Sequence, residues 1–128
     1  MNDHEADFLA FIEDPQRRRV RTLFELGAKR RPDLVAILHH KIRLDCRLCQ
    51  PIPGGSLSAP AVAARLRELG APAHCHVIGG GLDGRDAPLA DTLWDLIGFG
   101  DGAFVSCVSG RLGYYQYEEP NHAYLCRK

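Results

Sequence analysis

The C-terminal half of the chain, from His74 to Cys126, constrains the fold most, because its pattern is strand, helix, strand, strand, strand. In the segment HCHVI, alternation sends Cys75 and Val77 to one face of a strand and His74, His76 and Ile78 to the other. A helix is expected within 86–97. Three further apolar segments, joined by SGRLG and EEPN, then predict an antiparallel meander.

The first 70 residues instead have apolar residues at helical spacing in four segments, 3–13, 15–26, 32–44 and 58–69. Helical residues followed by strands predict an α+β fold. We expect about four N-terminal helices packed on one face of a small, largely antiparallel sheet of about four strands, with one further helix. Whether the first strand pairs in parallel with its neighbour stays open.

The length of 128 residues predicts a single domain, 1–128. Within it we expect a helical part at 1–44, a Pro/Gly-rich loop at 45–57 and an α+β part at 58–128. No apolar run approaches the roughly 18 residues of a membrane span. The acidic N-terminus lacks the pattern of a secretory signal, so a cytoplasmic location and no membrane partner are expected.

A metal site is the first candidate for chemistry. Cys46 and Cys49 have the spacing of two zinc ligands, and His39 and His40 lie just upstream. One CxxC motif is half a site, because strong zinc signatures show both ligand pairs. The alternatives are a zinc protein or metal-dependent hydrolase, a thiol redox pair, and ordinary loop thiols beside solvated histidines. Apart from zinc, no cofactor is indicated.

A second candidate is a ligand or anion site at LDGRDAPL, formed by Arg85, Asp86 and Arg111. The start of a helix there would offer free amides, and arginines would add donors. Against this, Asp86 is explained as a helix cap, and the glycines lack the spacing of a phosphate loop. A structural turn is the competing interpretation.

A third candidate is the basic segment Arg17–Arg21, in which Arg17, Arg18 and Arg19 are consecutive. Such a helix is able to follow nucleic-acid phosphates, but the net charge of the whole chain is zero, which favours a solvated or internally paired face. Tyr115 and Tyr117 share one face of their strand and are candidates for an interaction surface.

Covalent catalysis by Cys75 or Cys107 would need a base and an orienting group, which the sequence does not show. Since no catalytic constellation is complete, the sequence favours a non-catalytic binding, interaction or regulatory module, while leaving enzymatic activity open. Its partner is expected to be another protein or a second copy of itself. The alternatives are the metal protein built on Cys46 and Cys49 and the nucleic-acid binder.

Overall fold

The computed structural model describes residues 1–40, 42–119 and 122–128. Lys41, inside the third predicted helix, and Pro120 and Asn121, inside the predicted EEPN turn, lie outside the described residues. The α-helices are α1 Asp3–Phe8, α2 Gln16–Glu25, α3 Arg31–His40, α4 Ala59–Glu68 and α5 Leu89–Leu96. The strands are β1 Cys49–Pro51, β2 His74–Ile78, β3 Asp86–Pro88, β4 Ala103–Val108, β5 Leu112–Gln116 and β6 Ala123–Arg127.

The described strands form one six-stranded sheet in the order β1-β6-β5-β4-β2-β3, and each neighbouring pair is antiparallel. The predicted α+β class, the meander and the four N-terminal helices are confirmed. The antiparallel pairing of β2 with β4 settles the question left open by the sequence. The sheet has two more strands than expected, because β1 and β3 are edge strands of three residues that contain proline and are too short for an alternating pattern to be recognised in the sequence.

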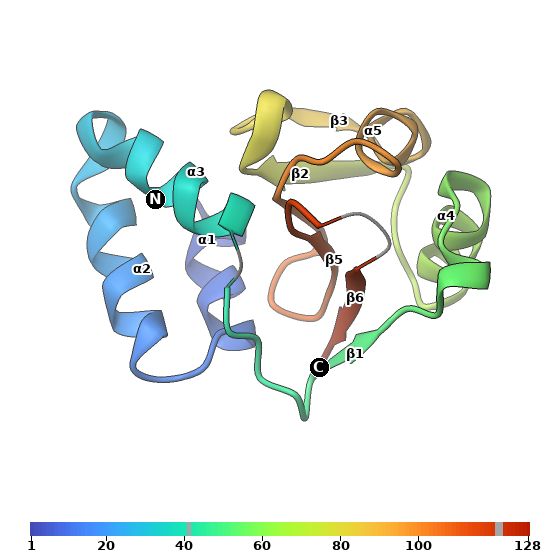
Figure 1. The fold of residues 1–128 in the computed structure, drawn as a ribbon, viewed down its shortest axis with the longest axis horizontal. Coiled ribbons are helices and arrows are strands. Elements are labelled where there is room, and N and C mark those ends of the chain that lie inside the picture. The colour runs from blue at the N-terminus through green and yellow to red at the C-terminus, as the bar shows by residue number, and fades with distance from the viewer. Residues whose placement is uncertain (41, 120–121) are drawn as a thin grey trace.

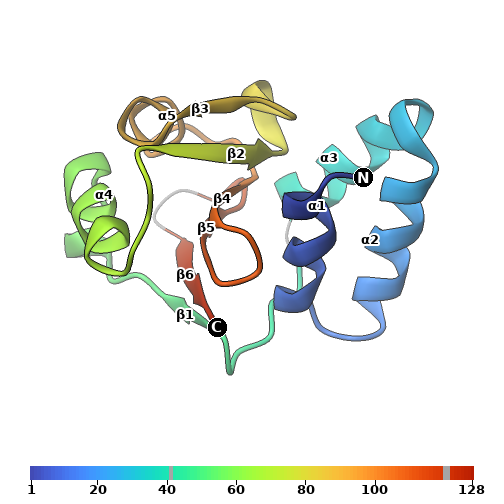
Figure 2. The ribbon, with the colours of Figure 1, turned by 180° about the vertical axis from the view of Figure 1, so that it is seen from behind.

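Helices cover both faces of the sheet, so the expectation that they pack on one face is wrong. Figure 1 shows α1, α2 and α3 on one side of the strands and α4 and α5 on the other, and the reverse view in Figure 2 agrees. Among the described residues, two hydrophobic cores result. Tyr115 and Phe104 belong to the core under the N-terminal helices, whereas Tyr114 and Val105 belong to the core under α4 and α5.

Local signals account for some of the helix ends. The Ser58 side chain accepts a hydrogen bond from the Ala61 amide and caps α4 as expected, and Gly27 follows α2 with φ 74°. The predicted cap at Asp86 is wrong. Asp86 begins β3, and α5 starts at Leu89 after Pro88, without a side-chain cap.

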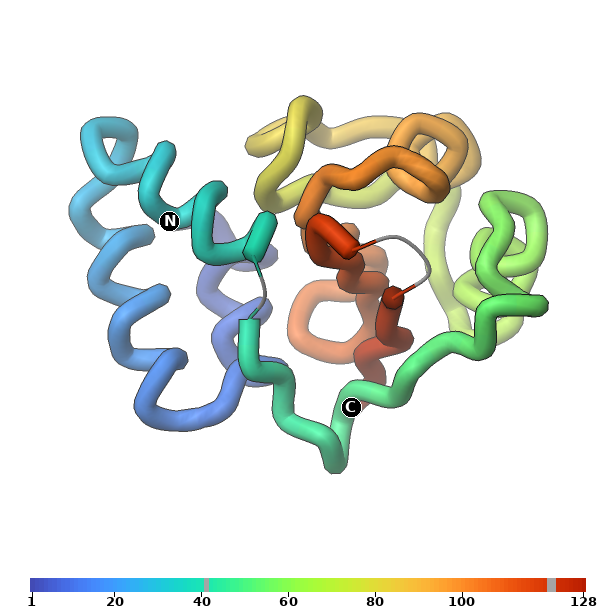
Figure 3. The backbone as a smooth tube through the Cα atoms, viewed as in Figure 1, coloured from blue at the N-terminus to red at the C-terminus, as the bar shows by residue number. Residues whose placement is uncertain are grey.

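The segment 45–57, expected to be a loop, carries the chain from the N-terminal helices to α4 and adds β1 to the sheet on the way, as the tube in Figure 3 shows. The end of α3 lies close against the start of β4. A Cβ atom at Gly102 would lie 2.2 Å from the His39 Cα atom, so only glycine allows this approach.

Strand β5 is buried along its whole length and bonds to helix ends on both sides of the sheet. The Tyr115 hydroxyl donates to the Leu38 carbonyl oxygen at 2.6 Å and accepts from the Ile42 amide at 3.1 Å. On the other face, the Gln116 side-chain nitrogen Nε2 donates to the Leu96 carbonyl oxygen at 2.9 Å. These groups satisfy carbonyls that a helix leaves free in its last turn.

Replacing Tyr115 by Phe is therefore expected to lower the free energy of unfolding by about 1–3 kcal/mol, because two buried backbone groups lose their partner. Urea denaturation of Tyr115→Phe measures this loss. Tyr124→Phe, at a partly exposed tyrosine of β6, is the matched control and is expected to change stability by less than about 0.5 kcal/mol. Equal losses in the two variants would contradict the role assigned to the Tyr115 hydroxyl.

Candidate functional site

A polar cluster lies where α1 and α3 meet the sheet. The Arg31 guanidinium donates to Glu5 of α1, and it binds both carboxylate oxygens of Asp83 at 2.7 Å. The Gly79 amide donates to Asp83 at 2.6 Å. One arginine thus joins the first helix, the third helix and the turn after β2.

These contacts shift the pKa values of both carboxyl groups. Burial raises the pKa of Glu5, but hydrogen bonds from Arg31 and the Asn2 amide outweigh it, and the pKa lies below its usual value of 4.5. Asp83 follows the same pattern, with burial opposed by Arg31 and the Gly79 amide, and its pKa lies below 3.8. The hydrogen bond to Asp83, followed by the one to Glu5, raises the pKa of Arg31. The three side chains are therefore charged at neutral pH.

His76 is buried beside this cluster, with Nδ1 2.8 Å from Asp86 Oδ1 and Nε2 3.1 Å from the Asn2 side-chain nitrogen Nδ2. The Asn2 Oδ1 atom already accepts from the Glu5 backbone amide, so Asn2 Nδ2 is the donor to Nε2. The ring proton of His76 is accordingly on Nδ1, facing Asp86. Asp86 therefore orients a histidine, and it does not cap a helix.

Ser106 of β4 completes a set of residue types that resembles catalytic machinery. His4 stacks on His76 with ring centroids 5.3 Å apart, and its Nδ1 lies 2.6 Å from Ser106 Oγ. Ser106 is only 2% exposed, because α1 covers it. In this closed arrangement the hydrogen bonds fasten α1 to the sheet and leave the hydroxyl no access to a substrate.

The predicted metal ligands are not brought together. His39 Nε2 and His40 Nδ1 lie 3.4 and 3.3 Å from the carboxylate of Glu118. Cys46 and Cys49 line a different cavity, next to Tyr124. Within the part of the chain that the structure describes, no group of three or more His, Cys, Asp or Glu side chains is placed to hold a metal ion.

The structure also separates the predicted anion-site residues. Arg85 is exposed and its carbonyl accepts from the Val77 amide, whereas Arg111 lies in the turn after Val108 at the far end of β4. Arg85 is bonded to Val77, which pairs with Val105 of β4, whereas Arg111 follows Val108, three residues further along that strand. The two arginines therefore lie at different positions along the length of the strands.

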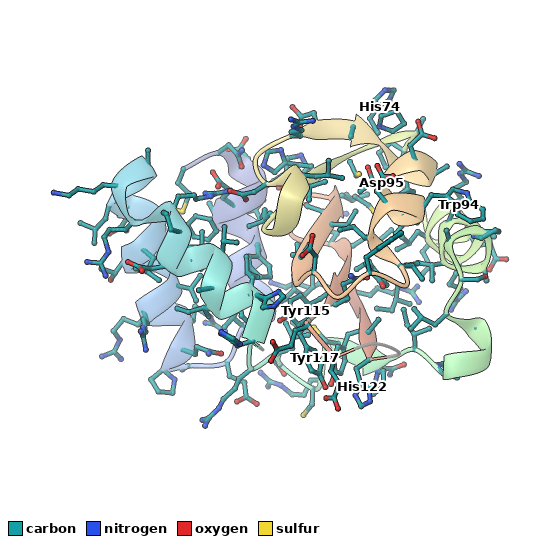
Figure 4. All side chains as sticks on the ribbon, turned by 45° about the horizontal axis from the view of Figure 1, so that its top comes forward. His74, Trp94, Asp95, Tyr115, Tyr117 and His122 are labelled. Atoms are coloured by element: carbon teal, nitrogen blue, oxygen red, sulfur yellow. The ribbon has the colours of Figure 1, made fainter. Side chains whose placement is uncertain are left out.

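Of the expected interaction residues, the arginines are accessible and the tyrosines are not. Arg18 and Arg19 are exposed on α2, whereas Arg17 is half-buried and its Nε donates to the Ile12 carbonyl at 2.9 Å. Tyr115 and Tyr117 are 0% and 7% exposed, so the expectation that they form an interaction surface is wrong. They share a face as predicted, but that face is part of the core under the N-terminal helices, and Figure 4 shows both side chains beside the end of α3.

A groove between α4 and the β1 edge of the sheet is the best candidate for a binding site. It encloses about 420 Å³, within the range of small-molecule sites. Ile52 and Leu125 belong to its apolar lining on the sheet side, and Val62 to that on the helix side. Small side chains on this side of α4 leave the space unfilled. The full lining is Gln50, Pro51, Ile52, Pro53, Ser56, Ala61, Val62, Ala64, Arg65, Glu68 and Leu125.

The outer edge of β1 is protected against the addition of another strand. Leu48 and Ile52 form backbone hydrogen bonds toward β6, so alternation turns the backbone groups of Cys49 and Pro51 outward. The Cys49 amide already donates to the Asp45 carbonyl, and Pro51 has no amide hydrogen. The edge therefore presents acceptors without donors, and a peptide strand pairs poorly with it. The periodicity of the sequence does not predict the groove, because the groove forms between segments that are far apart in the chain.

The Glu5–Arg31–Asp83 cluster has a testable pH dependence. Because both carboxyl pKa values are lowered in the folded state, the stabilisation from this cluster is complete above about pH 5. It begins to fall at the ordinary values of 4.5 and 3.8 and is lost as the pH drops further, through the lowered pKa values of the folded protein. Arg31→Met is expected to lower the free energy of unfolding by about 2–4 kcal/mol at pH 7, because it leaves two partly buried carboxylates unpaired.

The deficit of Arg31→Met is expected to shrink toward pH 3, as measured by urea denaturation across this range. Asp33→Asn is the control, since the Arg30–Asp33 pair is at least half-exposed and is expected to contribute less than about 0.5 kcal/mol. A deficit in Arg31→Met that is independent of pH would show that packing and not charge pairing accounts for it.

None of the described helices is long and apolar enough to cross a lipid bilayer. Comparisons with protein-family models, with curated proteins and with solved structures find no match to this chain.

Proposed function

We propose that this protein is a non-catalytic binding protein that takes up a small, neutral, amphipathic molecule in the groove between α4 and β1. The observation that supports this proposal is a groove of about 420 Å³ with an apolar lining from helix and sheet. Apolar grooves with a few polar groups at the rim are the usual form of small-molecule sites. We also propose the cytoplasm as its location, since all five cysteines are free thiols.

The polar groups of the groove favour a ligand without net charge. Arg65 and Glu68 are its charged lining residues, and they pair with each other at 3.2 Å. A charged ligand would gain from one of them and be repelled by the other. Gln50 and Ser56 add neutral hydrogen-bonding groups at the same site. An apolar body on Ile52 and a neutral polar end therefore match the groove best.

Filling the groove tests the proposal. Ala61 is exposed and lines the groove from α4, so Ala61→Phe adds a ring to the groove and removes no core side chain. Nile red, a neutral amphipathic dye whose fluorescence rises in apolar surroundings, is the probe. Wild-type protein is expected to bind it saturably, and Ala61→Phe is expected to weaken binding by about tenfold or more, because steric overlap costs at least about 1.4 kcal/mol.

Ala36→Phe is the matched control. Ala36 is also an exposed helical alanine, but it lines a different groove, between α2 and α3. Unchanged dye binding in Ala36→Phe supports the α4 groove. Loss of binding in Ala36→Phe with retention in Ala61→Phe would overturn the assignment.

A second candidate function, self-association, is favoured by an exposed tryptophan. Trp94 on α5 is 64% exposed, and the exposed Asp91 lies one helical turn before it on the same face. The exposed Asp95 follows Trp94 on the adjacent face (Figure 4). Large aromatic side chains in contact with water are typical of protein interfaces. A surface of complementary charge is present on α2, where the consecutive residues Arg18 and Arg19 are exposed. We propose that α5 of one copy binds α2 of another.

Such a contact joins two different surfaces, so mixed variants test it. Two variants are made, Trp94→Ala and the double variant Arg18→Glu/Arg19→Glu. Measured separately by analytical ultracentrifugation, each is expected to sediment as a monomer. A mixture of the two is expected to form heterodimers, because one intact α5 surface and one intact α2 surface remain. The association is also expected to weaken at high salt.

Arg127→Glu, which reverses an exposed charge at the end of β6, is the control and is expected to associate like the wild type. A wild-type protein that remains monomeric at low salt and high concentration would rule out this contact.

A further inference from the structure

Three cysteines lie in or next to the β1 edge of the sheet, and the two that belong to strands, Cys49 and Cys126, face away from the α4 groove. We call Cys46, Cys49 and Cys126 the cysteine site. Cys46 is exposed, Cys49 is 4% exposed and Cys126 is fully buried. Cys46 and Cys49 line one cavity of about 290 Å³, which also contacts Glu13 and Arg43. An external molecule is therefore able to reach the sulfur of Cys46 but not that of Cys126.

A single helical turn sets the spacing of Cys46 and Cys49. The amides of Leu48 and Cys49 both donate to the Asp45 carbonyl, at 3.0 and 2.9 Å. The Asp45 side chain accepts from the Arg47 amide at 3.0 Å and from its guanidinium at 2.8 Å, which fixes the start of the turn. Cys46 begins this turn, and Cys49 follows it as the first residue of β1. Since a hydrogen bond from residue i+4 to residue i closes the turn, the two backbones lie one turn apart, which suits a disulfide once the side chains rotate.

Cys126 approaches Cys49 from the other side, since the two residues are direct partners in the β1–β6 ladder. The flanking backbone hydrogen bonds run from the Arg127 amide to the Leu48 carbonyl and from the Ile52 amide to the Ala123 carbonyl. Cys49 and Cys126 therefore occupy a position of the antiparallel ladder at which the two opposed residues share no backbone hydrogen bond. Residues in such pairs have Cα atoms about 4.5 Å apart. Cys49 therefore has one cysteine neighbour at the surface and one in the core.

We propose that the cysteine site is a redox-active dithiol that exchanges with small disulfides, with Cys46 as the attacking thiol and Cys49 as the resolving thiol. This inference is independent of the groove and of self-association. The chemical class of substrate is a low-molecular-weight disulfide. Oxidised glutathione is a suitable probe, because Arg43 offers a charge for its carboxylates.

The chemistry balances in two steps. The Cys46 thiolate attacks one sulfur of the disulfide, forms a mixed disulfide and releases one thiolate, which takes a proton from water. The Cys49 thiol then loses its proton and attacks the Cys46 sulfur, so that the Cys46–Cys49 bond forms and a second thiolate leaves. The protein loses two electrons, and the disulfide is reduced to two thiols.

Cys126 is the less suitable partner for Cys49. Burial, together with the neighbouring Cys49, raises the pKa of the Cys126 thiol well above its ordinary value, so it stays protonated. A thiol is a far weaker nucleophile than a thiolate. The bond that forms is therefore between Cys46 and Cys49, although Cys126 lies close to Cys49.

The test follows the reduced 128-residue protein after addition of oxidised glutathione, with alkylation at set times and mass spectrometry of the peptides. The wild type is expected to form the Cys46–Cys49 bond and to release two glutathione thiols per chain. Cys46→Ser is expected to react at least about tenfold more slowly, because its remaining thiols are buried. Cys49→Ala is expected to stop at the mixed disulfide on Cys46.

Cys107→Ala is the matched control, because Cys107 is a buried cysteine of β4 in the other core, and it is expected to react like the wild type. Two results would overturn the proposal. One is a wild-type protein that keeps the mixed disulfide on Cys46 without forming a bond to Cys49. The other is a Cys49–Cys126 bond that forms as fast in Cys46→Ser as in the wild type.

Discussion

The hydrogen bonds from β5 to the helix ends are the interactions on which the layered structure depends. β5 lies inside the sheet with both faces covered, so each of its polar side chains needs a partner. Tyr115 binds the last turn of α3 on one face, and Gln116 binds the end of α5 on the other. Two adjacent residues thus hold opposite layers to the same strand. The burial of Tyr115 and Tyr117, which removes them as an interaction surface, follows from this arrangement.

The edge strand β1 separates the two proposed sites. Alternation along β1 and its continuation sends Gln50 and Ile52 toward α4, where the groove lies, and Cys49 toward the N-terminal helices, where the cysteine site lies. Pro51 lines both cavities and removes an amide from the outer edge. A segment of three residues therefore forms part of two cavities while blocking the addition of a further strand.

The polar cluster beneath α1 shows why residue types alone do not identify an active site. Ser106, His4, His76 and Asp86 are residues that hydrolases use, and their hydrogen bonds have good geometry. However, α1 covers Ser106, and the hydrogen-bonding capacity of His76 is used by Asp86 and Asn2. Together with the Arg31 ion pairs, these contacts hold α1 against the sheet. Accessibility, and not composition, distinguishes this cluster from a catalytic centre.

The sequence alone determined the elements whose cause is local. Periodicity gave the four N-terminal helices and the meander, Ser58 marked the start of α4, and alternation placed Cys75 and His76 on opposite faces of β2. Tertiary structure decided what depends on residues far apart in the chain. The edge strands β1 and β3 form only because β6 and β2 offer free backbone groups to pair with. The groove exists only because α4 lies over β1 and β6, and Cys49 meets Cys126 only through strand pairing. Such contacts join segments separated by tens of residues, and no local pattern in the sequence records them.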